Sequence, residues 1–337
     1  MGCSANMTEP IKRGGETTYL EAIREAMWEE MERDENVFLI GEDVGAYGGA
    51  FKASAGLIDR FGEERVIDTP ISEVAIVGAA SGAALMGMRP IAEMQFIDFI
   101  ACAFNQLTNF AAKSRYRGNG GCPIVVRGPA GAGVHGGPFH SLNAESYFFN
   151  TPGLKIVAPA TAYDAKGLLK SAIRDEDPVI FIEHKYLYRR VKEDLPDEDF
   201  VVPIGKASLR REGKDLTIIT FGATLYMADE AADTLDREGV STEILDLRSI
   251  LPFDQEAILQ SVRKTNRVII LHEAPLTGGV GGEFAALIAE KAFDYLDAPV
   301  KRVAAIDTPV PYSPPLEEFH LPSKERLLTA AREVLAY

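Results

Sequence analysis

Short apolar segments typical of strands alternate with helix-like segments along almost the whole of this 337-residue chain. The apolar segments are rich in Val and Ile, and strands of this kind joined by helices indicate a parallel sheet covered on both faces. In the first half of the chain, strands are expected at 37–41, 65–69, 90–96, 123–128, 154–160 and 178–183, and helices at 17–33, 73–87, 100–115 and 162–174. The alternation therefore predicts the α/β class.

A charged segment, residues 185–204, interrupts this alternation. It has two prolines and few consecutive apolar residues, so we interpret it as a connection between domains. Beyond it the alternation resumes, with strands expected at 215–222, 241–249, 267–274 and 300–306 and helices at 224–238, 254–264, 283–296 and from Ser323. We therefore predict two doubly wound domains, with a disordered or expression-derived tail over 1–16, a first domain over 17–186, a linker over 187–204 and a second domain over 205–337.

The composition excludes several classes of protein. Fifty acidic and 35 basic residues give a net charge of −15, so nucleic acid, which binds basic surfaces, is not an expected partner. A basic protein partner fits this charge, because opposite charges speed and orient docking. No apolar run reaches the length of a membrane span, and the start of the chain lacks a targeting pattern, so we expect a cytoplasmic protein. Three cysteines without a CxxC spacing fit a reducing compartment.

The dipeptide Ser72-Glu73 places a lone acid between a predicted strand and a run of Ala, Val, Ile, Leu and Gly. One interpretation is structural, in which Ser72 caps the following helix and Glu73 lies at the positive end of the helix dipole. The other is chemical, because a carboxyl group in an apolar place tends toward a raised pKa and can handle a proton. The two roles are compatible.

The helix predicted after Glu73 carries glycines four residues apart, Gly78 and Gly82, among alanines and Ser81. Glycine inside a helix costs up to about 1 kcal/mol relative to alanine, so its presence suggests close approach of another backbone. The contact could be tight packing within one domain. It could also be a contact between helices of two subunits, with the acid at its end.

Two glycine-rich loops, at 41–51 and 127–141, each follow a predicted strand. Their glycines allow close approach to a ligand or a positive φ. The second loop carries His140, which could pass a proton together with Glu73 or could simply bond to backbone. Neither loop has the spacing of a phosphate-binding or dinucleotide-binding motif, and the stretch 278–284 is read as a turn rather than an anion site.

Ten motifs, in order, resemble those of the β subunit of the decarboxylating E1 component of 2-oxo acid dehydrogenase complexes. They are GEDVGAYGG, DTPISEVAIVGAASG, IAEMQFIDF, RYRGNG, FHSLNAE, PGLKIVAPAT, YDAKGLLKSAIRDEDPVIFIEHK, LDLRSILPFD, HEAPLTGG and DTPVPY. The match runs from about Thr17 to Tyr337. The resemblance implies a pyrimidine-binding domain followed by a transketolase C-terminal-like domain. It also implies oxidative decarboxylation of pyruvate or a branched-chain 2-oxo acid, with transfer of the acyl group to the lipoyl group of the E2 acyltransferase.

The resemblance also implies roles for individual residues at a thiamine diphosphate site. Glu73 matches the acid that hydrogen-bonds N1′ of the aminopyrimidine, and Phe99 matches an aromatic residue that packs on this ring. Gln95 is expected near the same pocket. His140 matches the loop histidine that helps to hand the acyl group to the lipoyl arm. The resemblance thus implies that thiamine diphosphate is the group with which Glu73 exchanges a proton.

Metal ions and partner chains follow from the same resemblance. The family's α subunit holds magnesium and the diphosphate through a GDG motif, and no GDG occurs in this sequence. The resemblance therefore implies an α2β2 heterotetramer with the active site between subunits, and docking of the basic peripheral subunit-binding domain and the lipoyl domain of E2. Some relatives hold potassium near positions that correspond here to Ile124, Ala172, Asp175 and Asp177, although an ordinary turn would also account for these residues.

Four alternatives remain open, and not all of them belong to the same class. An acetoin dehydrogenase β subunit would share these motifs. A self-sufficient thiamine diphosphate enzyme of transketolase type would need the metal-binding half that the motifs lack. A non-catalytic scaffold between α and E2 would not need Glu73. An NAD-dependent oxidoreductase would need a dinucleotide fingerprint, which is missing here.

Overall fold

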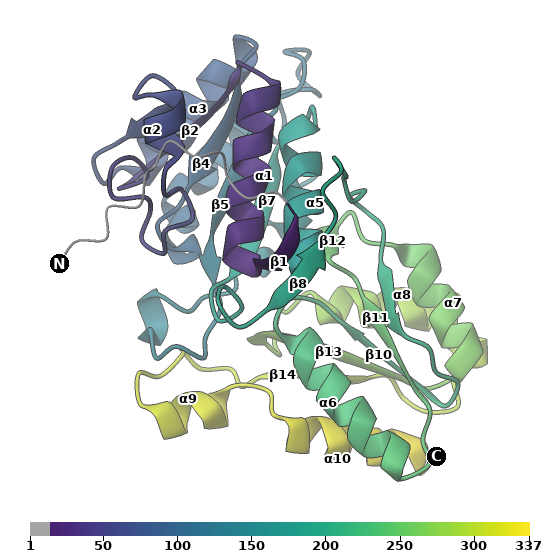
Figure 1. The fold of residues 1–337 in the computed structure, drawn as a ribbon. Helices are drawn as coiled ribbons and strands as arrows, with labels where there is room; N and C mark the ends of the chain where they lie inside the picture. Colours follow the sequence, from purple (N-terminus) through teal and green to yellow (C-terminus); the bar gives the residue numbers. More distant parts are fainter. Residues whose placement is uncertain (1–13) are drawn as a thin grey trace, which may run out of the picture. The chain divides into compact units, whose positions relative to one another are not determined.

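The computed structural model describes residues 14–337 in two compact units (Figure 1). The first unit contains the described residues up to Pro129 together with Asn150–Ile204, and the second contains Ala130–Phe149 with Gly205–Tyr337. Residues 1–13 lie outside the described part of the chain, and with them Cys3 and most of the predicted tail. Both units are α/β, as predicted, and between residues 14 and 337 no helix has the length and apolar character needed to cross a membrane.

A sheet forms the centre of the first unit, with strands in the order β6-β7-β5-β4-β2-β3. β2 pairs in parallel with both β3 and β4, as β4 does with β5 and β6 with β7. All residues of β2, β5 and β7 are buried, as expected for a sheet covered on both faces. The strands are β2 (Val37–Gly41), β3 (Val66–Asp68), β4 (Arg89–Glu93), β5 (Val125–Ala130), β6 (Lys155–Val157) and β7 (Val179–His184).

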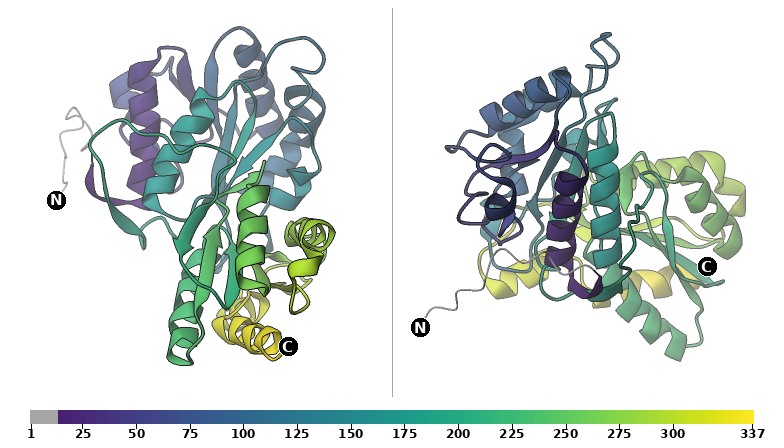
Figure 2. Two further views of the ribbon diagram at one scale, coloured as in Figure 1. Left: turned by 90° about the vertical axis from the view of Figure 1, so that its right-hand side faces the viewer. Right: turned by 45° about the horizontal axis from the view of Figure 1, so that its top comes forward.

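Helices cover both faces of this sheet (Figure 2). α1 (Tyr19–Arg33) and α5 (Ala162–Arg174) pack against each other on one face, and α3 (Glu73–Leu85) covers the other. A capping box begins α1, because the Thr18 hydroxyl accepts the N–H of Glu21 while the Glu21 carboxylate accepts the N–H of Thr18 at 2.8 Å. The α5 bounds agree with the predicted 162–174, and a short helix, α2 (Leu57–Phe61), was not predicted.

The helix predicted over 100–115 is wrong in type. A 3₁₀ segment, η1 (Ile97–Ala103), is followed by a π-helical segment, η2 (Gln106–Ala111), and both pack with α3. The Thr108 hydroxyl donates to the carbonyl of Phe104 at 2.8 Å. Short 3₁₀ and π-helical turns form where tertiary packing, here with α3, overrides the regular helix period.

A small antiparallel sheet joins the start of the described chain to a later segment. β1 (Gly15–Thr18) pairs with β8 (Lys192–Leu195), and Gly15 lies opposite Leu195. The tail predicted over 1–16 is therefore too long, because Gly15 and Glu16 belong to this sheet.

The charged segment predicted as a linker, 187–204, groups with the first unit over its whole length. The N–H of Val202 donates to the carbonyl of Gly167 in α5 at 3.1 Å, and the Asp199 carboxylate forms an ion pair with Lys170 of the same helix. Its charges thus serve contacts with α5, and the division between the units falls where the segment ends.

The second unit has a sheet in the order β14-β13-β10-β11-β9, parallel except for the antiparallel edge strand β9. α6 packs with α10 on one face, and α7 packs with α8 on the other. The strands are β9 (Ser208–Arg211), β10 (Leu216–Thr220), β11 (Thr242–Asp246), β13 (Val268–Pro275) and β14 (Lys301–Ala305), and the helices are α6 (Thr224–Arg237), α7 (Gln255–Thr265), α8 (Gly281–Lys291) and α10 (Lys324–Leu335). The helix predicted over 283–296 ends at Lys291, and the 3₁₀ segment η4 (Phe293–Tyr295) follows it. Short elements that were not predicted are β9, β12 (Ser249–Leu251) and α9 (Pro314–His320).

The segment Ala130–Phe149 groups with the second unit, although the prediction placed it in a first domain over 17–186. It contains η3 (Gly137–Phe139) and α4 (Glu145–Phe149). The Phe149 ring packs on Phe253 and Phe284 of that unit, with ring centroids 6.4 and 6.3 Å away. These apolar contacts, and the carboxylate contacts described below, explain the grouping.

A buried charge cluster lies in the core of the first unit. Arg127 of β5 is 1% exposed and donates to the carboxylates of Glu93 in β4 and Glu183 in β7. The Tyr188 hydroxyl donates to Glu183 at 2.7 Å, and burial raises the Tyr188 pKa well above its usual range. The cluster ties together three strands through one guanidinium group.

Candidate active site

Ser72 and Glu73 stand at the start of α3. The prediction that the Ser72 side chain caps this helix is wrong, because its hydroxyl makes no capping hydrogen bond. The Ser72 N–H instead donates to Oε1 of Glu42 at 3.3 Å, and its carbonyl accepts the N–H of Ile76 at 2.9 Å. A carboxylate that follows β2 therefore holds the turn before the helix.

Two carboxylates meet at this helix start. Glu42 is 5% exposed, whereas Glu73 is half-buried. Burial raises the pKa of Glu42, and the neighbouring charge of Glu73 raises it further. Within the described part of the chain, the Glu73 carboxylate forms no hydrogen bond. It is thus able to accept or share a proton with a ligand nitrogen.

Gln95 and Phe99 follow β4 in the same unit. Gln95 Nε2 donates to Oδ2 of Asp43 at 3.0 Å. The Phe99 ring lies edge-on to Phe96, with centroids 6.4 Å apart and planes at 89°. A common pocket of these two residues with Glu73 stays a prediction.

The glycine-rich loop 41–51 is folded by contacts of its own. The N–H of Gly45 donates to Asp68 at 2.6 Å, and a Cβ at this position would lie 2.4 Å from that carboxylate. Gly48 and Gly49 follow in the left-handed region, each with φ of 79°. Side chains are therefore excluded here for structural reasons, and Gly45, Gly48 and Gly49 are buried.

α3 exposes an apolar face. Val74 is 46% exposed, and Met86 just after the helix is 85% exposed. A Cβ at Gly82 would meet no atom within 4 Å, and one at Gly78 would meet a single side-chain atom at 3.9 Å. Tight packing within one domain would fill this space. The strip is therefore open in the described chain, and a contact between subunits stays a prediction.

His140 lies in the second unit, directly after η3, and is half-buried. The segment that leads to it has an alternating backbone, with φ of 82° at Gly131, 83° at Gly133, 60° at His135 and 67° at Gly137. Such alternation turns successive N–H groups toward one point and makes an anion-binding nest. The predicted pairing of His140 with Glu73 of the first unit stays a prediction.

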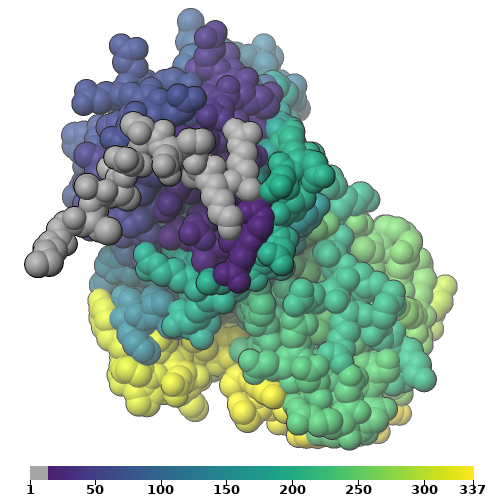
Figure 3. Space-filling view, in the orientation of Figure 1, coloured from purple at the N-terminus to yellow at the C-terminus, as the bar shows by residue number. Residues whose placement is uncertain are grey.

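The anion in this nest is the carboxylate of Glu317, from α9. Its Oε1 accepts the N–H of Gly133 at 3.0 Å and of His135 at 3.3 Å, and its Oε2 lies 2.6 Å from Nδ1 of His135. Glu317 is 1% exposed. Figure 3 shows the α9 region, in yellow, beside the blue-green segment that leads to His140.

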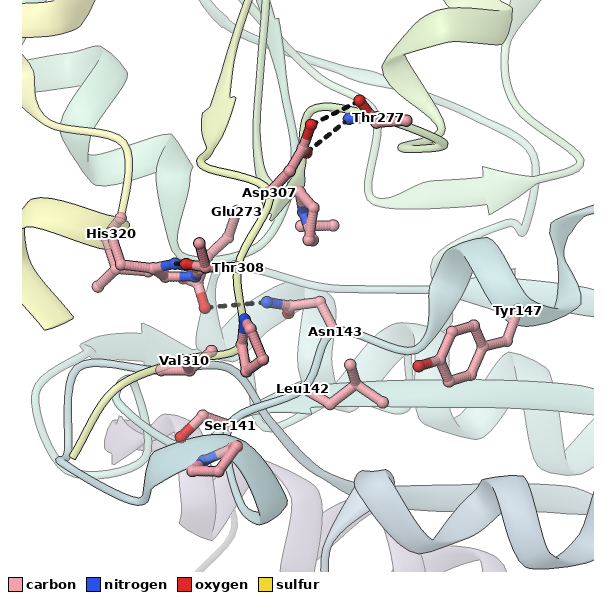
Figure 4. A pocket seen from close by; sticks show the side chains of 15 residues that line it. Ser141, Leu142, Asn143, Tyr147, Glu273, Thr277, Asp307, Thr308, Val310 and His320 are labelled. Atoms are coloured by element: carbon pink, nitrogen blue, oxygen red, sulfur yellow. Dashed lines mark hydrogen bonds between the residues drawn. The ribbon is translucent and has the colours of Figure 1, made fainter.

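A second carboxylate, Glu273 of β13, holds the other side of the same segment. It accepts the N–H of Ala132 at 2.7 Å and Nδ2 of Asn143 at 2.9 Å (Figure 4). A cavity of about 510 Å³ adjoins these residues and is lined also by Asp307 and His320.

A third carboxyl group of the second unit, Glu145 of α4, is buried and belongs to the segment itself. It is 2% exposed, and its Oε1 has no hydrogen-bond partner among the described residues. Burial raises its pKa from 4.5 to about 7, and the charge of Glu273 acts in the same direction. This group therefore titrates close to neutral pH.

The four positions predicted to hold potassium lie in the first unit. The Ile124 carbonyl accepts the N–H of Val179 at 2.9 Å, and the Ala172 carbonyl accepts that of Asp175 at 3.3 Å. Lys155 Nζ lies 2.6 and 2.7 Å from the Asp175 carboxylate oxygens. Arg115 likewise pairs with Asp177 at 2.7 Å. The carboxylates of Asp175 and Asp177 are thus each paired with a cationic side chain of the protein. No cluster of three or more His, Cys, Asp and Glu suited to a metal occurs in residues 14–337, and the potassium site stays a prediction.

The glycines at 278–284 have a packing role. A Cβ at Gly279 would lie 2.5 Å from the ring of His272, and one at Gly281 would lie 2.8 Å from it. His272 is fully buried, and burial lowers its pKa to about 4. The glycines thus allow α8 to begin against a neutral ring.

Sequence reasoning missed the acids that support the site, Glu42, Glu273 and Glu317. Glu42 and Glu273 lie in motifs that also carry the resemblance, GEDVG and HEAP, and an acid beside a buried strand was a usable signal. Glu317 stands in a proline-rich stretch that no period marked as a helix, so its burial had no signal in the sequence.

Comparison with known proteins supports the predicted family. The model of the transketolase pyrimidine binding domain matches residues 16–191, and that of the transketolase C-terminal domain matches residues 205–327. The 2-oxoisovalerate dehydrogenase subunit beta of Bacillus subtilis is 52% identical over 323 residues, covering 95% of this chain and 99% of that protein. The pyruvate dehydrogenase E1 component subunit beta of the same organism is 44% identical over 322 residues, with coverage of 95% and 99%.

Two further similarities agree with this result. The mitochondrial 2-oxoisovalerate dehydrogenase subunit beta 2 of Arabidopsis thaliana is 45% identical over 335 residues, covering 98% of this chain and 92% of that protein. A solved structure described as a split gene transketolase, inactive beta4 tetramer, shares the fold, with a TM-score of 0.78, 23% identity, and coverage of 96% and 99%. The acetoin and self-sufficient alternatives are not favoured by these relatives. The chain belongs to the family of β subunits of the E1 components of 2-oxo acid dehydrogenases.

Proposed function

We propose that this chain supplies one half of a thiamine diphosphate site and acts with an α chain in the oxidative decarboxylation of a 2-oxo acid. The observation that carries the proposal is the half-buried Glu73 carboxylate, which forms no hydrogen bond within residues 14–337 and stands at the end of an open apolar helix face. A carboxylate in this position is suited to a nitrogen of a bound ring.

The residues present fit the pyrimidine end of the cofactor. Glu73 would hold and move a proton at N1′. Phe99 would pack on the ring, with Gln95 nearby. When bound, the cofactor supplies a carbon nucleophile and an electron sink for decarboxylation.

The α chain would cover the apolar face of α3 and bring the diphosphate and magnesium site. The open strip at Gly78 and Gly82, with the exposed Val74 and Met86, supports a helix-to-helix contact at this place. An α2β2 heterotetramer in the cytoplasm is the assembly that we propose. The net charge of −15 supports docking of a basic domain of E2.

His140 would act in the second half of the reaction, as a proton donor to the lipoyl group that accepts the acyl unit. Its place at the end of a glycine-rich segment of the second unit supports this role. A branched-chain 2-oxo acid is the substrate that we propose, because identity to the 2-oxoisovalerate enzyme subunit of B. subtilis, 52%, exceeds the 44% to the pyruvate enzyme subunit of the same organism.

The test is co-expression with the α chain and a decarboxylation assay on 2-oxoisovalerate, pyruvate and acetoin. Glu73→Gln should lower turnover by about 10²–10⁴-fold with the tetramer intact, as expected for loss of a proton-transfer group. Glu63→Gln, at an exposed glutamate of the same unit, is the matched control and should leave turnover unchanged.

The other outcomes distinguish the alternatives. Unchanged turnover in Glu73→Gln would support a scaffold and would contradict the catalytic role. Turnover by the purified chain without an α chain would contradict the heterotetramer. Faster turnover of pyruvate or acetoin than of 2-oxoisovalerate would contradict the proposed substrate class.

A further inference from the structure

We infer that Glu317 is a positioning residue for acyl transfer: its carboxylate fills the backbone nest at 131–137 and thereby places His140 for its reaction with the lipoyl group. The inference rests on the proposed function, which assigns His140 to that step. Glu317 itself touches neither cofactor nor substrate in this scheme.

The first support is the conformation of the segment. Every second residue from Gly131 to Gly137 has a positive φ, and one of them is His135, which is not a glycine. A left-handed backbone is unfavourable for a residue with a side chain, and glycines are free to adopt many other conformations. The sequence of this segment therefore does not hold the observed shape by itself, and an outside contact must select it.

The second support is the completeness of the Glu317 contact. The carboxylate receives two backbone N–H groups and approaches the imidazole of His135, so both of its oxygens are engaged. It is buried, and hydrogen bonds to a charged acceptor are stronger than those between neutral groups. Loss of the carboxylate would leave the converging N–H groups of the nest without their acceptor.

The third support is a second anchor beside the first. A Cβ added at Gly137 would lie 2.1 Å from the ring of Tyr312, which precedes α9, so backbone and ring are in close contact. The stretch from Tyr312 to Glu317 thus contacts the segment both before and after residue 136, shortly before His140. Movement of α9 would be transmitted directly to the histidine.

The experiment uses the α2β2 tetramer and separates the two half-reactions. Decarboxylation is measured with an artificial electron acceptor, and reductive acylation is measured on an isolated lipoyl domain by mass spectrometry. Glu317→Ala should lower acylation by about 10- to 100-fold while decarboxylation stays within about threefold of wild type. Glu317→Gln keeps an acceptor for the N–H groups and should lie between the two.

A double-variant comparison tests whether Glu317 acts through His140. His140→Ala should lower acylation, and adding Glu317→Ala should lower it no further, because residues that act as a unit are not additive. Glu318→Ala removes the exposed neighbour on the same helix and should leave both half-reactions unchanged. If Glu317→Ala does not assemble, Glu317→Gln serves for the same comparison.

The outcomes separate this inference from the proposed function. Absence of decarboxylation in the wild-type tetramer would overturn the proposed function itself. An active wild type with normal acylation in the Glu317 variants would overturn only the inference, as would an equal fall of both half-reactions. Independent, multiplying losses in the double variant would also overturn it.

Discussion

Buried charges serve different purposes in the two units. In the first unit, the Arg127 guanidinium lies between the carboxylates of Glu93 and Glu183, so each charge meets an opposite charge within the sheet. In the second unit, Glu317 and Glu273 accept backbone N–H groups, and they hold the segment that carries His140. The first arrangement joins strands to one another, and the second shapes a loop.

The difference has an energetic consequence. A buried ion pair contributes little net stability when intact, but removal of one partner leaves a charge that cannot be solvated. A buried carboxyl group that lacks both a cation and full hydrogen bonding, such as Glu145, avoids that cost by taking up a proton, so it becomes sensitive to pH near neutrality. The Arg127 cluster of the first unit should therefore respond most to substitution, and Glu145 of the second unit to pH.

The largest effect is expected for Arg127→Met. Two buried carboxylates would lose their cation, which typically costs about 3–5 kcal/mol of unfolding free energy. Trp28 is the single tryptophan and lies in α1, so its fluorescence in the purified chain reports unfolding of the first unit in urea.

The control for this variant restores charge balance. Adding Glu93→Gln and Glu183→Gln to Arg127→Met should recover a large part of the loss, because no charge is then left unpaired in the core. Equal stability of the single and triple variants would show that packing, and not charge, sets the cost.

A smaller effect of opposite sign is expected for Glu145→Gln, because loss of this carboxyl group should stabilise the protein at high pH. Between pH 4.5 and about 7 the folded state retains a proton on Glu145 that the unfolded chain has lost, so stability falls as pH rises through this window. Above pH 7 the full cost is present, on the order of 3 kcal/mol from the size of the shift. Glutamine carries no charge at any pH, so the variant should exceed wild type at pH 8.5 and match it near pH 5.

Thermal unfolding of both proteins from pH 5 to pH 9 measures this difference. The exposed Glu318→Gln should follow the wild-type curve throughout. Parallel curves for wild type and Glu145→Gln would mean that Glu145 is ionised in the folded protein, and the contrast between the two units would then be lost.

Much of the fold could be predicted because apolar residues recur along the main elements with the period of a helix or a strand. α5 shows it in its own residues, with a threonine cap at Thr161 and a basic last turn at Arg174. The 3₁₀ and π-helical segments after β4 could not be predicted, because their packing with α3 leaves no separate pattern in the sequence. Nor could β1 and β8, since their pairing joins residues 15–18 to 192–195, far apart in the chain.

The sequence names the expected reacting groups of the candidate site, but it does not indicate the groups that support them. Glu73 lies in a motif that can be read without a structure. The hydrogen bond of Ser72 to Glu42 and the contact of Glu317 with Gly133 link residues 30 and 184 positions apart. Contacts of that span leave no local pattern, so only the folded chain shows which acid supports which loop.

The smallest effect concerns two helical glycines, one with free space beside its Cα in the first unit and one packed against a side chain in the second. Gly82→Ala adds a methyl group to a strip of α3 where no atom lies within 4 Å, so it should raise the stability of the isolated chain by up to about 1 kcal/mol through helix propensity alone. Gly281→Ala places its Cβ 2.8 Å from the buried His272 ring, so overpacking should make the change unfavourable. Urea unfolding of the isolated chain compares the two variants.

The same Gly82→Ala should weaken assembly with the α chain, as measured by the concentration at which the tetramer dissociates, because the open strip is then filled. A stabilised chain that assembles as well as wild type would mean that another surface of the first unit meets the partner.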